Sequence, residues 1–186
     1  MKPGLALFLL SVAPAWCQIA PRAVLPGHTV AISRAARIPA GTIKELEQDF
    51  NNRLVTMAGI NTNESVDLLG DTRGLQLEDY GVVFTSEVSL VVTPGLMPGR
   101  PKIPPEMAAR VHKLRVERMP LLAATMKEML RHMAAAFTQI PENQQLVLVV
   151  RLYYGAWEDT TGMPSQVMMK ADRASAAAGK VETEER

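Results

Sequence analysis

The chain has 186 residues, its formal net charge at pH 7 is +1, and 21% of its residues are charged. This near-neutral balance excludes the strongly basic surface on which nucleic-acid binding depends. The length suffices for one domain with a hydrophobic core of its own. The sequence contains no nucleophile, phosphate-loop or zinc-binding motif, so it indicates a fold class more clearly than a function.

The N-terminus is typical of a secretory signal peptide. A single positive charge, Lys2, precedes an apolar run that ends at Trp16, and the small residues Ala15 and Cys17 would lie just before the cut. The apolar run is shorter than the ~20 residues of a membrane-spanning helix. We therefore expect residues 1–17 to be removed on export to the periplasm or extracellular space, which would leave no transmembrane segment.

Cys17 is the only cysteine of the chain, and its fate separates two interpretations of this segment. The alternative to simple cleavage is a lipoprotein, in which an acylated Cys17 anchors the protein to lipid. Trp16 argues against the lipoprotein, because such signals place a small residue before the cysteine. Cleavage after Cys17 would leave a domain without disulfides, which must be stabilised by its core alone.

Residues 18–39 predict a linker, followed by a single domain at residues 40–173. The first helix is expected to begin at a capping box, in which Thr42 and Glu45 bind free amides of the first turn. Its polar side is expected to face water. Apolar residues at helical spacing mark the side that packs on the core: Ile43, Leu46, Phe50, Leu54 and Met57.

The most regular stretch is residues 80–92, whose period of two predicts a long strand. Residues 66–77 predict either a hairpin or a bulged edge strand around Gly70, with Glu78 and Asp79 in the turn before the long strand. The core-facing positions expected in the long strand are Tyr80, Val82, Phe84, Ser86, Val88, Leu90 and Val92.

A long helical stretch contains Pro120, so two segments with a kink between them are predicted at residues 105–118 and 120–138. The second segment has one apolar stripe: Met119, Leu122, Met126, Met129, Met133 and Phe137. Continued backwards, this stripe would bring Arg115 and Arg118 into the core. The first segment is therefore expected to use an offset stripe instead: Met107, Val111 and Leu114.

Two further strands are predicted at residues 145–154 and 166–173. Residues 174–186 predict a disordered tail or a frayed helix, because no apolar residue there could anchor the chain to the core. The predicted architecture is a two-layer α+β domain with a mixed or antiparallel sheet of about four strands. A kinked long helix and the N-terminal helix would cover one face of the sheet. The long helix would return the chain for a parallel pairing of residues 80–92 with residues 145–154.

The histidines are expected to be ordinary linker or helix residues: His28, His112 and His132. A sharper hypothesis is a copper(I) site formed by Met126, Met129 and Met133 with His132, because thioether and imidazole ligands suit this ion. A core role is favoured, since the stripe continues into leucine and phenylalanine, which cannot bind metal. We therefore predict no metal and no cofactor.

Two acidic pairs lie in loops at strand ends, Glu78-Asp79 and Glu158-Asp159. If the sheet brought the two pairs together, they would form a weak calcium or hydrolytic site. Solvated turn residues are the commoner role of such acids.

Three motifs can be compared with known sequences: residues 77–84 (Leu-Glu-Asp-Tyr-Gly-Val-Val-Phe), residues 157–159 (Trp-Glu-Asp) and residues 162–169 (Gly-Met-Pro-Ser-Gln-Val-Met-Met). They resemble a family of exported proteins of unknown function from soil bacteria of the acidobacterial type. The likeness covers roughly residues 40–173. It implies export and no particular activity.

The leading functional prediction is an exported, non-enzymatic binding domain. It would contact an unidentified protein or a component of the cell envelope, and not nucleic acid, through a sheet edge or the aromatic residues 153–157 at the end of the strand predicted at residues 145–154. The expected contact residues are Tyr153, Tyr154, Trp157, Glu158 and Asp159. The alternative is a hydrolase or metal-dependent enzyme that uses the two acidic pairs. The sequence does not predict the oligomeric state.

Overall fold

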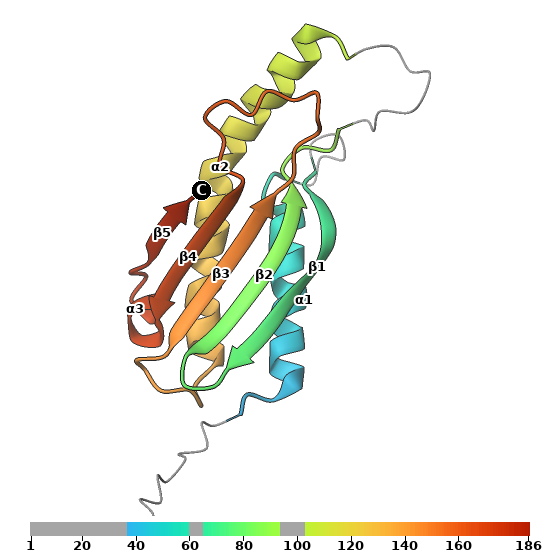
Figure 1. Cartoon of the computed structure of the whole chain (residues 1–186). Coiled ribbons are helices and arrows are strands. Elements are labelled where there is room, and N and C mark those ends of the chain that lie inside the picture. The colour runs from blue at the N-terminus through green and yellow to red at the C-terminus, as the bar shows by residue number, and fades with distance from the viewer. Residues whose placement is uncertain (1–36, 60–64, 94–102) are drawn as a thin grey trace, which may run out of the picture. The chain divides into compact units, whose positions relative to one another are not determined.

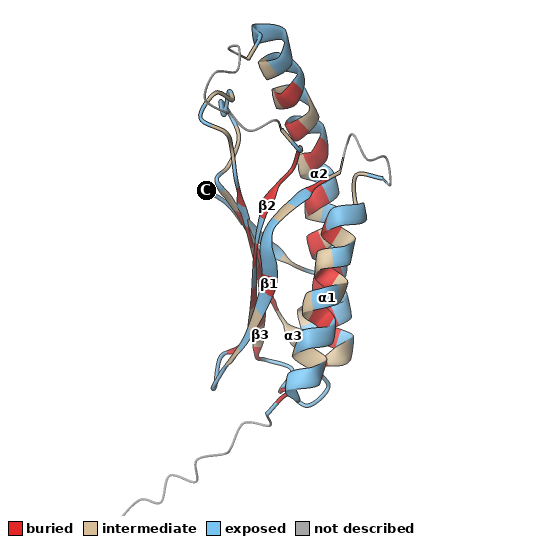
Figure 2. Ribbon diagram, turned by 90° about the vertical axis from the view of Figure 1, so that its right-hand side faces the viewer, coloured by how far each residue is buried: buried red, intermediate tan, exposed pale blue. Residues whose placement is uncertain are grey.

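A computed structural model describes residues 37–59, 65–93 and 103–186, which form a mixed five-stranded sheet with all helices on one face (Figures 1 and 2). The strands are β1 (Asp67–Leu77), β2 (Gly81–Ser89), β3 (Gln145–Leu152), β4 (Gln166–Asp172) and β5 (Glu182–Glu185). The helices are α1 (Ala40–Thr56), α2 (Pro105–Ala136) and α3 (Arg173–Ala177). The predicted two-layer α+β class is confirmed. The signal peptide and nearly all of the predicted linker lie outside the described residues.

The strand order follows the sequence from β1 to β5. β2 and β3 are parallel, with Gly81 beside Gln145, and α2 returns the chain between them, as predicted. β1 is one continuous edge strand with irregular register around Gly70, so the bulged strand is confirmed and the hairpin alternative is wrong. The predicted turn is also present, and Asp79 has a φ of 59° there.

The core lies between the sheet and α1 and α2. Phe84, Val88, Leu148 and Met129 are all 0% exposed, and the predicted apolar stripe of α2 packs on the sheet. Tyr80 and Val92 were expected in this core, but they lie just beyond the ends of β2 and are 43% and 49% exposed.

α1 does not begin as predicted. It begins at Ala40 behind Pro39, and the expected capping box is wrong, since no side chain caps this end. The polar side also does not simply face water. Glu47 Oε1 accepts a hydrogen bond from the backbone N–H of Gly74 at 2.7 Å, and Asn51 Oδ1 accepts one from Thr72 at 3.0 Å. α1 thereby satisfies outward-facing amides of the edge strand β1.

α2 is a single helix, so the prediction of two segments is wrong. Pro120 lies inside the helix on an exposed turn. The carbonyl that loses its partner there belongs to Val116, which is 49% exposed, so water can replace the lost hydrogen bond. The apolar stripe therefore continues backwards without a change of phase. It buries Arg115 and Arg118, while Met107 of the expected offset stripe is 40% exposed.

The folded domain extends beyond the predicted boundaries at both ends. Ile38 belongs to the core, and its N–H donates to Gln76 Oε1 at 2.9 Å. At the other end, the predicted disordered tail is wrong, because α3 and β5 occupy residues 173–185 and β5 pairs with β4 in antiparallel fashion. The C-terminal residue continues this pairing, since the Arg186 carbonyl accepts from Gln166 N–H at 3.1 Å.

Neighbouring leucines of α2 offer a matched test of the core. Leu122 is 0% exposed and Leu121 is 43% exposed. We expect Leu122→Ala to lower the free energy of unfolding by about 2–5 kcal/mol, because it leaves a cavity beneath the helix. Leu121→Ala should change it by less than about 0.5 kcal/mol. Urea denaturation followed by circular dichroism measures both, and equal effects would contradict the burial of this stripe.

Candidate functional site

A buried polar cluster lies at the carboxyl ends of β2 and β3, where α2 meets the loop of residues 153–165. Arg115 of α2 and Glu158 of the loop have side chains that are 0% and 2% exposed. Arg115 Nε lies 2.5 Å from Glu158 Oε2, and Arg115 Nη2 donates to Oε1 at 2.9 Å. The Nη2 contact is a hydrogen bond, whereas Nε and Oε2 lie close together without a hydrogen bond between them, so one hydrogen bond and the opposite charges hold the pair.

Two further groups complete the surroundings of the guanidinium. Arg115 Nη2 also lies 3.2 Å from Ser89 Oγ, the hydroxyl at the end of β2. The ring of Tyr154 lies against the guanidinium, with its centroid 4.9 Å from the central carbon. Partial burial raises the pKa of the Tyr154 hydroxyl, and the Arg115 charge opposes this effect. Arg115 Nη1 has no hydrogen-bond acceptor among the described residues.

Arg118, one turn further along α2, has a different role. Its Nη1 donates to the carbonyl of Leu90 and lies 3.5 Å from the carbonyl of Ser65. Ser65 precedes β1 and Leu90 follows β2, so neither carbonyl takes part in the pairing of these two strands. Arg118 therefore satisfies backbone acceptors at this end of the sheet.

The loop of residues 153–165, called the aromatic loop below, is held at several points besides the ion pair. Tyr153 N–H donates to the Val88 carbonyl at 2.8 Å, and the Tyr154 hydroxyl donates to the Pro164 carbonyl at 2.6 Å. His112 Nδ1 of α2 lies 2.9 Å from the Asp159 carbonyl. The loop is thus bound to β2, to itself and to α2.

The five predicted contact residues have four different roles. Tyr153 is 55% exposed and free to contact a partner. Tyr154 and Glu158 instead surround Arg115, and Trp157 packs so closely on Gly155 that a Cβ there would lie 2.9 Å from its Nε1.

Asp159 is the fifth of these residues, and it is exposed. Its carboxylate accepts from the Thr161 N–H at 2.9 Å. This hydrogen bond is the main reason why the pKa of Asp159 lies below its ordinary value. Asp159 therefore stabilises the turn inside the loop.

The two acidic pairs do not converge, so the hydrolytic or metal site expected from them is wrong. Glu78 and Asp79 precede β2, whereas Glu158 and Asp159 follow β3, and β2 and β3 are parallel. β2 spans nine residues, which at about 3.3 Å per residue separates the two sheet ends by about 26 Å. Within the described residues no cluster of three or more acidic, histidine or cysteine side chains could hold a metal.

The methionines of the proposed copper site are fully buried among apolar neighbours, as the core interpretation predicts. His132 does not turn toward them. Its Nδ1 lies 2.9 Å from Asp49 Oδ2 of α1, which Arg53 Nε also contacts at 2.7 Å. These groups clamp α1 to α2 at the surface, and the polar contacts of His132 in the described part of the chain include no hydroxyl that it could activate.

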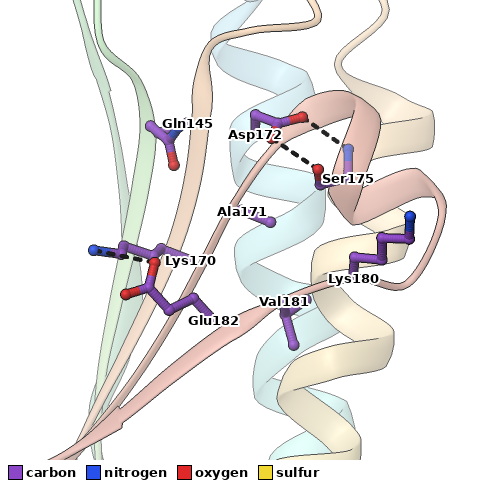
Figure 3. Close-up of a pocket in the computed structure, with 8 residues that line it drawn as sticks. All are labelled: Gln145, Lys170, Ala171, Asp172, Ser175, Lys180, Val181 and Glu182. Carbon is purple, nitrogen blue, oxygen red and sulfur yellow. Dashed lines mark hydrogen bonds and ion pairs between the residues drawn. The ribbon is translucent and has the colours of Figure 1, made fainter.

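A hollow of about 360 Å³ lies between β4, β5 and α3 (Figure 3). Four of its polar side chains are already engaged: Asp172 accepts from Ser175 N–H and Oγ, each at 2.8 Å, and Lys170 lies 3.4 Å from Glu182. The ammonium groups of Lys170 and Lys180 lie on opposite sides of the hollow (Figure 3). The charges therefore do not converge on a common ligand position.

The buried ion pair leads to a stability prediction. We expect Glu158→Gln to lower the free energy of unfolding by about 3–5 kcal/mol, because it leaves the Arg115 charge buried without compensation. Adding Arg115→Met to this variant should recover part of the loss, since no buried charge remains. Urea denaturation of the single and double variants measures the coupling.

The matched control is Glu128→Gln, which removes an exposed ion pair with Arg131 of 3.0 Å. It should cost less than about 1 kcal/mol. If Glu158→Gln were as mild as Glu128→Gln, the ion pair would not hold the aromatic loop.

The Asp49 clamp leads to a pH prediction. Partial burial raises the pKa of Asp49, but hydrogen bonds and charge from Arg53 and His132 outweigh it, so the pKa lies below the ordinary 3.8. A carboxylate with a lowered pKa stabilises the fold above pH 3.8 and loses this contribution as the pH falls through its folded pKa. The melting temperature of the wild type should therefore exceed that of Asp49→Asn at neutral pH, and the difference should shrink as the solution becomes acidic. A melting-temperature difference that stays constant with pH would contradict this prediction.

No helix in the described ranges is long and apolar enough to cross a membrane. The chain was compared with models of protein families, with curated proteins and with solved structures, and none of them matches it.

Proposed function

We propose that this protein is an exported, non-enzymatic binding domain whose contact surface is the aromatic loop. The observation that carries the proposal is an exposed aromatic side chain on a fixed backbone. Tyr153 is 55% exposed, while its own N–H is bound to the end of β2. Tyrosine contributes large contact area with few rotatable bonds, so it is favoured at protein interfaces.

The anchoring of the loop supports this role. Arg115 and His112 of α2 hold Glu158 and the Asp159 backbone, so binding would not have to order a mobile segment. A surface that is already ordered loses less conformational entropy on association, which raises affinity. Binding residues are often placed on loops that a rigid scaffold positions in this way.

The distribution of polar groups also favours binding over catalysis. Arg115 and Glu158 neutralise each other, Arg118 is bound to backbone carbonyls, and the two acidic pairs lie at opposite ends of the sheet. Export rests on the N-terminal sequence pattern and remains part of the proposal. The partner class is a protein or an envelope component with an apolar or aromatic contact patch.

The test compares two tyrosines at opposite ends of the sheet. Tyr153 is 55% exposed and Tyr80 is 43% exposed, so loss of either ring removes a similar exposed surface. We expect Tyr153→Ala to weaken capture of partners from the periplasmic fraction by about 30-fold, the cost of an interface anchor of about 2 kcal/mol. Tyr80→Ala should capture the same set as wild type. Quantitative mass spectrometry of the eluates measures both, and an unchanged set with Tyr153→Ala would refute the aromatic loop as the contact surface.

A further inference from the structure

The N-terminal part of α2 projects beyond the strands and beyond the end of α1 (Figures 1 and 2). α1 has 17 residues and α2 has 32, so at about 1.5 Å per residue α1 leaves about 22 Å of α2 without a neighbouring helix among the described elements. His132 marks the side of α2 on which α1 packs, because it contacts Asp49. Leu114 lies about five full turns before His132, so it is on the same side, in the part that α1 does not reach.

This side of α2 carries apolar residues at a spacing of seven: Met107, Leu114 and Leu121. Met107 is 40% exposed, Leu121 is 43% exposed and Leu114 is half-buried. A hollow of about 500 Å³ lies beside them, between α2 and Val92, which is itself 49% exposed. Apolar residues that recur every seven positions form the seam along which two helices pack, so this side of α2 offers a place for a second helix.

Two opposite charges lie beside this seam. Arg110 and Glu117 occupy positions between the three apolar residues, and both are exposed. Arg110 makes no ion pair within the described ranges, and the one ion pair of Glu117 there, with Lys113, spans 4.0 Å. A partner helix that presented the two charges in reverse order would match them. The same helix running in the opposite direction presents this reverse order.

We propose that a second copy of this chain occupies this side of α2, with its own α2 running antiparallel about a two-fold axis at Leu114. Such an axis places Leu114 against its own equivalent and Met107 against Leu121 of the second copy, beside the hollow. Arg110 meets Glu117 of the second copy to within one residue, and this contact occurs twice by symmetry. The seam is therefore complementary to itself.

Charge selects the antiparallel arrangement over the parallel one. A two-fold axis along α2 would pair each residue with its own equivalent, so Arg110 would meet Arg110 and Glu117 would meet Glu117. Lys113 does not interfere in the antiparallel arrangement. Its side chain is 79% exposed and lies about 100° around the helix from Leu114, so it points to solvent.

The interface consists of two half-helices and is small, so we expect a dissociation constant of about 10–100 μM. The dimer therefore dissociates at the low micromolar concentrations of a denaturation experiment, in which Leu121 behaves as an exposed residue.

The first experiment is sedimentation of the full chain at about 1 to 500 μM with a matched pair of substitutions. Leu121 and Val116 are 43% and 49% exposed, but Val116 lies on another side of α2. Wild type and Val116→Asp should be dimers at the highest concentration. Leu121→Asp should be a monomer there, because it places a carboxylate against Met107 of the second copy. Wild-type protein that remains monomeric, or Val116→Asp as monomeric as Leu121→Asp, would overturn the proposal.

The second experiment exchanges the charges and leaves the apolar seam intact. Arg110→Glu and Glu117→Arg should each raise the dimer dissociation constant at least about tenfold, because each brings like charges together. The double variant should return to within about threefold of wild type. A double variant no tighter than the single ones would overturn the antiparallel arrangement. The aromatic loop packs on a different side of α2, through His112 and Arg115, so these results are independent of the binding function proposed above.

Discussion

The buried pair of Arg115 and Glu158 connects parts of this structure that lie 43 residues apart in the chain. It joins the first half of α2 to a loop that follows β3, and the hydroxyl of Ser89 adds the end of β2 to the same cluster. Two charges removed from water carry a large desolvation penalty, which only close, multiply hydrogen-bonded geometry offsets. The pair is therefore better understood as a constraint on where the loop can lie than as a source of net stability. Loss of either member would remove this link between the loop and α2.

Periodicity was enough to predict the layers of the fold. The alternation in β2 and the helical stripe from Leu122 to Phe137 both reflect burial on one side, and burial is what holds the sheet against the helices. The same helical stripe, continued toward the N-terminus, includes Arg115 and Arg118. That continuation was rejected because charged side chains without partners are rarely buried. The compensating groups, Glu158 and the Leu90 carbonyl, are distant in sequence, so only the tertiary structure could show that these charges are paired.

The C-terminal segment could not be predicted because its sequence carries no pattern of burial. β5 consists of Glu182, Thr183, Glu184 and Glu185, and no apolar periodicity marks it as a strand. It forms because β4 offers a free row of backbone donors and acceptors, which stabilise a strand of any composition. In the same way, the contact residues of the aromatic loop could be named from sequence, but their roles could not. Tyr153 and Tyr154 are adjacent, yet one is exposed and the other lies beneath a guanidinium.

The polar composition of β5 also protects this edge of the sheet. An unpaired edge invites further strands, and glutamate side chains on a short edge strand oppose such pairing. At the other edge, β1 is bulged, and α1 hydrogen-bonds its outward amides through Glu47 and Asn51. Both edges of the sheet are therefore protected against pairing with a further strand, one by its charges and the other by the side chains of α1.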